Sequence, residues 1–145
     1  MFTHEFTVRF QHVDRAGIAF FARAFEYCHE AFEELLIASA QLNVFESEGW
    51  GMPLVHAEAD FRAPMRLGDR LRVTVRVAEL GERSIQFAFD ITDLDGELRA
   101  RVRHVHAFID LTSFRPRAVP EGLRAGLDRL GLLQDLPNAA PQDLA

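Results

Sequence analysis

The feature that most constrains the fold is a change of hydrophobic period within residues 6–36. Apolar and polar residues alternate at the start of this stretch, with the apolar ones at Phe6, Val8 and Phe10. A period of two predicts a half-buried strand, which we expect to end near Val13. The sequence Asp14-Arg15-Ala16-Gly17 then breaks the alternation.

From Phe21 onward the apolar residues follow steps of three and four, which predicts a long amphipathic helix. The stripe consists of Phe21, Phe25, Cys28, Phe32, Leu35 and Leu36, with Ala24 and Ala31 beside it. A helix N-terminus offers unpaired N–H groups and a partial positive charge. Asp14 is therefore expected in a loop just before donors that can polarise a carbonyl group for attack.

Four further strands are predicted downstream, because apolar and polar residues alternate over 55–61, 71–77, 85–91 and 97–111. Asp95-Gly96 is a strong hairpin signal. In the last strand the apolar phase slips by one residue, which predicts a bulge near His104 or a strand buried on both faces. Residues 39–51 read as a loop, and Pro120 is expected to open a short helix.

The order of strand, long helix and four strands predicts an α+β architecture. The helix must bury its stripe against the sheet, so an antiparallel sheet of about five strands is expected to wrap around one central helix. That is the shape of a hot-dog fold. We expect one domain over residues 1–133 and a flexible tail over 134–145.

Composition excludes several classes of function. The 145 residues carry a formal net charge of -6, which argues against a general nucleic-acid binder. All basic residues are Arg, so Lys nucleophiles, Schiff bases and a Walker A loop are excluded. The single cysteine, Cys28, cannot form an intramolecular disulfide, which favours a cytoplasmic location. We expect no signal peptide and no membrane-spanning segment.

Several segments together resemble a known family. They are VRFQHVDRAGIAFF, PLVHAEADFRAPMRLGDRL, LGERSIQFAFDI, DGELRARVRHVHAFID and RPRAVPEGL. With them, the chain resembles the acyl-CoA thioesterases of the 4-hydroxybenzoyl-CoA thioesterase family over nearly its whole length. CHEAFE together with PLVHAEADF looks most like the branch that hydrolyses 1,4-dihydroxy-2-naphthoyl-CoA in phylloquinone and menaquinone synthesis.

The resemblance implies roles for three residues around the helix start. Asp14 matches the catalytic aspartate, either as nucleophile on the thioester or as general base for water. Gly17 matches the glycine that lets the backbone approach the substrate, and Phe21 matches the position whose N–H polarises the thioester carbonyl. The Asn usual near the helix start is missing, since Ala22-Arg23-Ala24 stands there.

The substrate-binding residues implied by the resemblance are Arg83 and Ser84, for the coenzyme A phosphates, and His29, near the acyl ring across a subunit boundary. His56 is a further pocket candidate, because it follows the Pro-Leu-Val segment expected to cross the helix. The resemblance implies an acyl-CoA substrate and no cofactor. Because a single sheet leaves a groove open beside its helix, we expect a homodimer or a tetramer.

Simpler interpretations stand beside these. Asp14 could serve only as a turn or helix-entry residue, where Asp is favoured. His12, His104 and His106 are expected to be structural. The histidines lack metal-ligand spacing, so no metal site is expected. Cys28 is expected to be a buried apolar residue and not a nucleophile. The Arg99, Arg101 and Arg103 series predicts a solvated strand face first and a phosphate-binding face second.

Rival functions also remain at this point. Benzoyl-, hydroxybenzoyl- and medium-chain acyl-CoA or acyl-carrier-protein thioesters are alternative substrates. A hot-dog dehydratase or hydratase is a second enzyme class, which would require a catalytic His paired with an acidic helix residue in a longer chain. A non-catalytic acyl-CoA binding module is a third class, and it would bind thioesters without turning them over.

Overall fold

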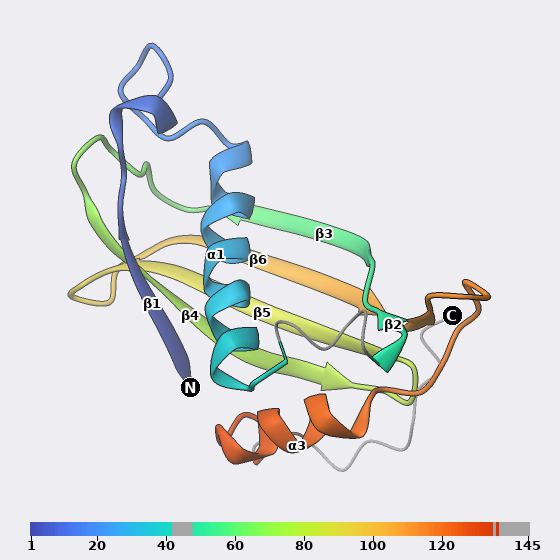
Figure 1. Cartoon of the computed structure of the whole chain (residues 1–145). Helices are drawn as coiled ribbons and strands as arrows, with labels where there is room; N and C mark the ends of the chain where they lie inside the picture. Colours follow the sequence, from blue (N-terminus) through green and yellow to red (C-terminus); the bar gives the residue numbers. More distant parts are fainter. Residues whose placement is uncertain (42–47, 135, 137–145) are drawn as a thin grey trace.

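The computed structural model describes residues 1–41, 48–134 and 136, and it shows a curled antiparallel sheet with one long helix lying across one face (Figure 1). Because the helix contacts β1, β4 and β6, it crosses the sheet from the edge strand β1 as far as β6. The predicted α+β class is confirmed. The elements are β1 (Phe2–Thr7), a 3₁₀ turn (Phe10–His12), α1 (Ala22–Ala38), β2 (Trp50–Gly51), β3 (Leu54–Phe61), β4 (Arg70–Leu80), β5 (Ser84–Asp93), β6 (Leu98–Ala107), β7 (Ile109–Asp110) and α3 (Glu121–Arg129).

The five long strands follow the order β1-β4-β5-β6-β3, so β3 forms one edge of the sheet. The two short strands β2 and β7 pair separately. The core lies between α1 and the inward residues of β4, β5 and β6. Among the described residues, no helix combines the length and apolarity needed to cross a bilayer. The tail predicted from Gln134 lies, apart from Gln134 and Leu136, outside the described residues.

The first strand ends earlier than the alternation predicts. β1 stops at Thr7, and Phe10 is 79% exposed in the 3₁₀ turn that follows. The Arg9 N–H donates to Nδ1 of His12 at 3.1 Å. This local bond gives the backbone an alternative to a strand ladder, and the chain turns instead of extending to Val13.

The buried face of α1 is rotated relative to the predicted stripe, because Tyr27 is buried and Phe21 is 59% exposed at the N-cap. The Tyr27 ring stacks on Phe6 with centroids 4.0 Å apart. Its hydroxyl lies 2.9 Å from Nδ1 of His12, so the one polar atom of the side chain is paired. A tyrosine with a paired hydroxyl is buried as readily as a phenylalanine.

The last long strand keeps a single phase, so the bulge predicted near His104 is wrong. His104 pairs regularly with Ala57 on one side and with Phe87 on the other. The inward positions of β6 are Ala100, Val102, His104 and His106. Burial on both faces is also wrong, because Arg101 and Arg103 are exposed. The apparent slip arose because two inward positions hold histidines.

The short helix α3 packs on the C-terminal end of α1. Gly126 of α3 sits against Ser39, the C-cap residue of α1. A Cβ at position 126 would lie 2.8 Å from both the Cβ and the backbone oxygen of Ser39. The absence of a side chain at Gly126 therefore sets how closely the two helices approach.

Candidate active site

Asp14 lies in a tight turn at the N-terminal end of α1. Its Oδ1 accepts hydrogen bonds from the backbone N–H of Ala16 at 2.8 Å and of Ile18 at 3.4 Å. The Gly17 N–H closes the turn by donating a hydrogen bond to the Asp14 carbonyl at 3.0 Å. Gly17 has a φ of +75°, a conformation that favours glycine. Among the described residues, nothing pairs with Oδ2. The turn therefore fixes the carboxylate and leaves one of its oxygens free.

The Asp14 loop is held against the β3–β4 connection. The Ala19 N–H donates to the Met65 carbonyl at 2.7 Å, and the Leu67 N–H donates to the Gly17 carbonyl at 3.1 Å. On its other side, the Phe20 N–H donates to the His12 carbonyl at 2.9 Å. These backbone bonds fix the position of the carboxylate relative to the start of α1.

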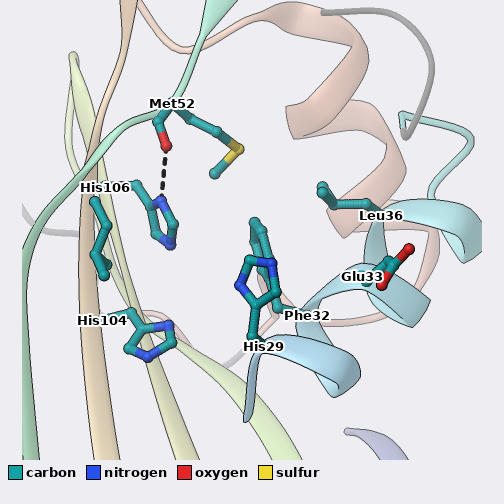
Figure 2. A pocket seen from close by; sticks show the side chains of 8 residues that line it. His29, Phe32, Glu33, Leu36, Met52, His104 and His106 are labelled. Carbon is teal, nitrogen blue, oxygen red and sulfur yellow. Dashed lines mark hydrogen bonds between the residues drawn. The ribbon is translucent and has the colours of Figure 1, made fainter. Parts of the chain in front are cut away.

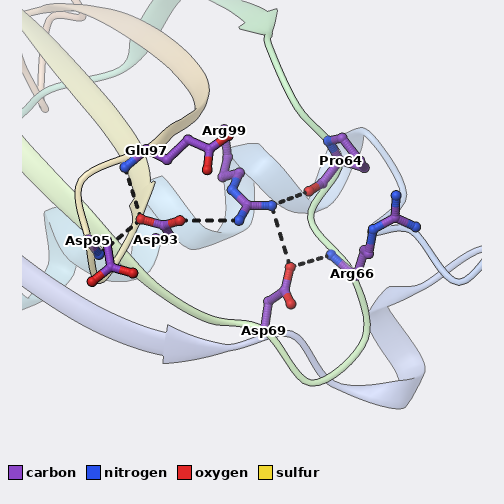
Figure 3. A network of polar contacts seen from close by, with 7 residues as sticks. All are labelled: Pro64, Arg66, Asp69, Asp93, Asp95, Glu97 and Arg99. Atoms are coloured by element: carbon purple, nitrogen blue, oxygen red, sulfur yellow. Dashed lines mark hydrogen bonds and ion pairs between the residues drawn. The ribbon is translucent and has the colours of Figure 1, made fainter.

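Arg99 in turn anchors the β3–β4 connection (Figure 3). Its Nη1 donates to the Pro64 carbonyl at 2.8 Å and lies 3.7 Å from the Asp69 carboxylate. Its Nη2 donates to Asp93 at 3.4 Å. The Glu97 backbone N–H, and more weakly the Arg99 guanidinium, hold the pKa of Asp93 below its usual value. Arg99 therefore belongs to a partly buried polar network that supports the loop and not to a solvated strand face.

The start of α1 offers a donor close to this loop. The Phe21 N–H makes no hydrogen bond within the part of the chain that the structure describes. A cavity of about 350 Å³ lies beside it, lined by Ile18, Phe21, Phe61 and Met65 among others. Asp14 and Gly17 thus lie in the loop that leads to the N-terminus of α1, where Phe21 is the N-cap residue.

A second cavity, of about 450 Å³, lies between α1 and β6 (Figure 2). His29 reaches it from α1, while His104 and His106 reach it from the strand. We call it the histidine cavity. It opens beside a further hollow of about 530 Å³, which shares His29, Leu54 and His104 with it. The histidine cavity is lined by His29, Phe32, Leu36, Met52, His104 and His106, together with Glu33 and Leu54.

His104 and His106 are predicted to be structural residues, and three of their four ring nitrogens have no hydrogen-bond partner within the described part of the chain. Among the described residues, only Nδ1 of His106 has a partner, the Met52 carbonyl at 2.9 Å. Burial lowers the pKa of His104 to about 4 and lowers that of His106 as well. Sequence reasoning missed this pair, although both histidines continue the inward phase of Ala100 and Val102.

The other predicted substrate-binding residues lie away from Asp14 within one subunit. His56 is on the face of β3 opposite the histidine cavity, 3.7 Å from Glu58. A register shift between Leu54 and His56 explains this, because one extra residue reverses the face of those that follow. Arg83 is exposed and Ser84 is buried in the β4–β5 turn, at the opposite end of β4 from the Asp14 loop.

No group of three or more potential metal ligands occurs among the residues that the structure describes. Cys28 is fully buried in α1, and burial raises the pKa of its thiol. A buried thiol with a raised pKa is a poor nucleophile.

Residues 8–127 match the family model of the thioesterase-like superfamily. The chain belongs to this superfamily. It is similar to the 1,4-dihydroxy-2-naphthoyl-CoA hydrolase of Nostoc punctiforme, with 36% identity over 83% of this chain and 82% of that protein. The hydrolase of the same name from Synechococcus sp. strain CC9605 is 33% identical over 90% of this chain and 93% of that one.

Among solved structures, the fold is similar to that of a 1,4-dihydroxy-2-naphthoyl-CoA thioesterase from Synechocystis. The TM-score is 0.82 and the identity 28%, over 90% of this chain and 97% of that chain. The predicted hot-dog fold, the predicted family and the class of thioester hydrolase are confirmed by these likenesses. The reaction of a thioester hydrolase is acyl transfer from a thioester to water.

Proposed function

We propose that the protein hydrolyses an aromatic acyl-CoA to the free acid and coenzyme A, with 1,4-dihydroxy-2-naphthoyl-CoA as the preferred candidate. The names of the relatives support this substrate. The observation that carries the proposal is the Asp14 carboxylate, whose Oδ1 is fixed by two N–H groups in the loop that leads to α1. At the start of that helix, the Phe21 N–H is unpaired among the described residues.

Asp14 has two possible roles in the reaction. As a nucleophile, Oδ2 attacks the thioester carbonyl carbon, coenzyme A leaves as the thiolate, and water then hydrolyses the mixed anhydride. As a general base, Oδ2 takes a proton from a water molecule, which attacks the same carbon. In both routes the carbonyl oxygen gains negative charge, and the Phe21 N–H at the positive end of α1 stabilises it.

A site this small suits a thioester. The carbonyl carbon of a thioester is more electrophilic than that of an amide, and the thiolate leaves readily. One carboxylate and a helix N-terminus can then supply the stabilisation that a peptide bond would require from a larger group of residues. Gly17 contributes the φ of +75° that the turn requires, and among the described residues nothing lies within 4 Å of a Cβ built at this position, so the turn faces open space there.

We further propose that a second subunit completes the site. β3 is an edge strand in which all residues except Ala59 are exposed, including the apolar Val55 at 60%. Antiparallel pairing of two such strands about a two-fold axis places the start of one beside the end of the other. Leu54 lines the histidine cavity and Phe61 lines the cavity beside Phe21. The histidine cavity of one subunit would then face the Asp14 loop of its partner.

Coenzyme A would extend outward from such a composite site. Arg83 is exposed at the β4–β5 turn, near the end of β6 that carries His106, because Ser84 pairs with Ala107. An exposed guanidinium is well suited to a phosphate group. We propose that Arg83 contacts the coenzyme A phosphates, and that the neighbouring Ser84 holds the turn in place.

The experiment that tests the function is a panel of thioesters, assayed by release of free thiol. It includes the coenzyme A esters of 1,4-dihydroxy-2-naphthoate, benzoate, 4-hydroxybenzoate and phenylacetate, and a medium-chain acyl-CoA. The wild type is compared with Asp14→Asn, in which the amide oxygen still accepts from Ala16 and Ile18. The control is Asp110→Asn, because Oδ1 of Asp110 also accepts two backbone N–H groups, from Thr112 and Ser113.

We expect a preference for aromatic thioesters, loss of turnover of 100-fold or more in Asp14→Asn, and unchanged turnover in Asp110→Asn. If Asp14→Asn keeps its turnover, Asp14 is a turn residue only, and the histidines become the candidates for catalysis. If the wild type binds thioesters but hydrolyses none, the chain is a binding module. A preference for the medium-chain ester would replace the aromatic substrate.

A further inference from the structure

His104 and His106 bring unpaired polar atoms to the wall of an otherwise largely apolar cavity. The two residues are only 3% and 5% exposed. Within the described part of the chain, both ring nitrogens of His104 and Nε2 of His106 lack a hydrogen-bond partner. A buried polar atom left unpaired costs about 1–3 kcal/mol. Three such atoms around one cavity point to a ligand, or to ordered water, that pairs with them.

The Met52 carbonyl fixes the tautomer of His106. A carbonyl oxygen only accepts hydrogen bonds, so Nδ1 of His106, 2.9 Å away, carries the proton and donates it (Figure 2). The lowered pKa of His106 keeps the ring neutral near pH 7. Nε2 then presents a bare lone pair. A ligand that pairs with it must bring a hydrogen-bond donor.

His104 adds a complementary pair of groups. Its pKa of about 4 keeps it neutral near pH 7, so it offers one N–H donor and one acceptor. Its ring centroid lies 5.9 Å from that of His106. Hydroxyl groups both donate and accept, and they therefore match the two imidazoles better than a carbonyl, which accepts only, or a methylene, which does neither.

Aromatic side chains hold the two imidazoles in place. The Phe32 ring stacks on His106 with centroids 5.0 Å apart and an angle of 15° between the planes. Phe89 lies 4.7 Å from His104, centroid to centroid. Rings packed in this way have little freedom to rotate, so their nitrogens keep their directions. A cavity of about 450 Å³, with apolar walls made by the Phe32 ring and by Leu and Met side chains, has the size and character of a site for an aromatic ring.

We propose that the histidine cavity binds the ring of the acyl group and that His104 and His106 select rings that carry a hydroxyl group. This inference rests on the proposed function, because it locates the acyl group of that reaction. A hydroxyl donates to Nε2 of His106, and His104 pairs with the same or a second hydroxyl. A ring without hydroxyls leaves these atoms unpaired, and for that reason binds more weakly.

Equilibrium binding tests the selection without requiring turnover. The probes are 1,4-dihydroxy-2-naphthoic acid, kept reduced, and 2-naphthoic acid, each titrated by fluorescence into the full-length protein. We expect the wild type to bind the hydroxylated acid at least tenfold more tightly. His106→Leu and His104→Leu should bring the ratio close to one, whereas His106→Gln, which keeps an amide near the position of Nε2, should retain part of it. His4→Gln, on the opposite edge strand β1, should keep the full ratio.

Two results would overturn the proposal. One is a ratio near one in the wild type, and the other is a tenfold preference that survives in folded His106→Leu. A cavity that only holds water predicts the second result. Circular dichroism shows which variants fold. If neither leucine variant folds, the binding ratio of His106→Gln decides between the two outcomes. Histidine-dependent binding without hydrolysis of any thioester would refute the proposed function alone. Hydrolysis without hydroxyl preference would refute only this inference.

Discussion

Nη1 of Arg99 donates a hydrogen bond to the carbonyl oxygen of Pro64 at 2.8 Å. Through this bond β6 fixes the β3–β4 connection, which carries Met65 and Leu67. Those two residues hold the Asp14 loop by backbone hydrogen bonds. The Arg99 guanidinium thus acts on the Asp14 loop through the β3–β4 connection and does not contact the loop itself. Its contribution to catalysis would be positional.

Arg99→Met should lower kcat more than it raises KM. The variant keeps the aliphatic stem but leaves the Pro64 carbonyl, Asp69 and Asp93 without their shared donor, so the loop loses its fixed position. We expect a loss of about 1–3 kcal/mol in the free energy of unfolding, measured by urea titration. Arg99→Lys should recover part of the lost kcat and part of the lost free energy of unfolding. An unchanged kcat in a destabilised Arg99→Met would limit Arg99 to a structural role.

Tyr27→Phe should destabilise the protein modestly. The Phe6 stacking is retained, and only the hydrogen bond between the hydroxyl and Nδ1 of His12 is lost. We expect a loss of about 1 kcal/mol, measured by urea denaturation. Tyr27→Leu also removes the stacking and should cost more. Equal losses in the two variants would show that the hydroxyl, and not the ring, accounts for the stabilisation.

Stability should fall on mild acidification because of His104. The unfolded imidazole titrates near pH 6.5 and the folded one at about 4. Above pH 6.5 neither form binds the proton, so the group has no effect there. Between pH 6.5 and 4 only the unfolded chain takes it up, which lowers the free energy of unfolding by about 2 kcal/mol at pH 5.

The measurement is urea denaturation at pH 7 and pH 5 for the wild type and His104→Leu. The wild type should lose more stability than the variant between these two pH values. Identical losses in the two proteins would mean that His104 is protonated as easily in the folded chain as in the unfolded one.

Gly126→Ala should destabilise the packing of α3 on α1, although alanine favours a helix by about 1 kcal/mol. The new Cβ would lie 2.8 Å from the Ser39 backbone oxygen, which cannot move freely. We expect a net loss of about 1–2 kcal/mol in thermal or urea unfolding. Gly122→Ala is the matched control, because its Cβ meets only the Gln41 side chain at 3.3 Å. A stabilised Gly126→Ala would contradict this close packing.

Disruption of the β3 edge should lower the oligomeric state. Val55→Glu adds a charge to an apolar residue that is 60% exposed on this strand. Sedimentation velocity should give a dimer or tetramer for the wild type and a smaller species for the variant. Leu94→Glu, at an apolar residue 45% exposed in the β5–β6 hairpin, should leave the mass unchanged. A monomeric wild type would refute the composite site.

Hydrophobic periodicity was sufficient to predict the sheet and α1. Strands such as β4 bury every second residue, and apolar residues recur at steps of three and four along the helix. Periodicity failed at side chains that are both polar and buriable. Periodicity does not place Tyr27 in the helix stripe, because its partner, His12, is distant in sequence. Alternation assigns imidazole to solvent, so His104 and His106 look like a break in phase. The turn at Asp14 was predictable because it depends on local residues only.

Alternation over 55–61 places His56 on the polar face of β3, as the structure does, but it could not place Leu54. The face of Leu54 depends on the register shift between Leu54 and His56, and that shift depends on how β3 pairs with β6. The histidine cavity is a tertiary feature in the same sense. It combines His29 of α1 with two residues of a strand more than seventy positions away in the sequence.

The complete burial of Cys28 means that the rate at which its thiol is labelled reports how often α1 separates from the sheet. No other thiol is present, and Cys28 lies in the middle of α1 on its buried face. An aromatic disulfide reagent can therefore react only after the helix has separated from the sheet. If labelling occurs at the rate of global unfolding, helix and sheet open as one cooperative unit. Faster labelling would show that the helix detaches by itself, and the same measurement with a naphthoate bound would show how strongly a ligand slows that detachment.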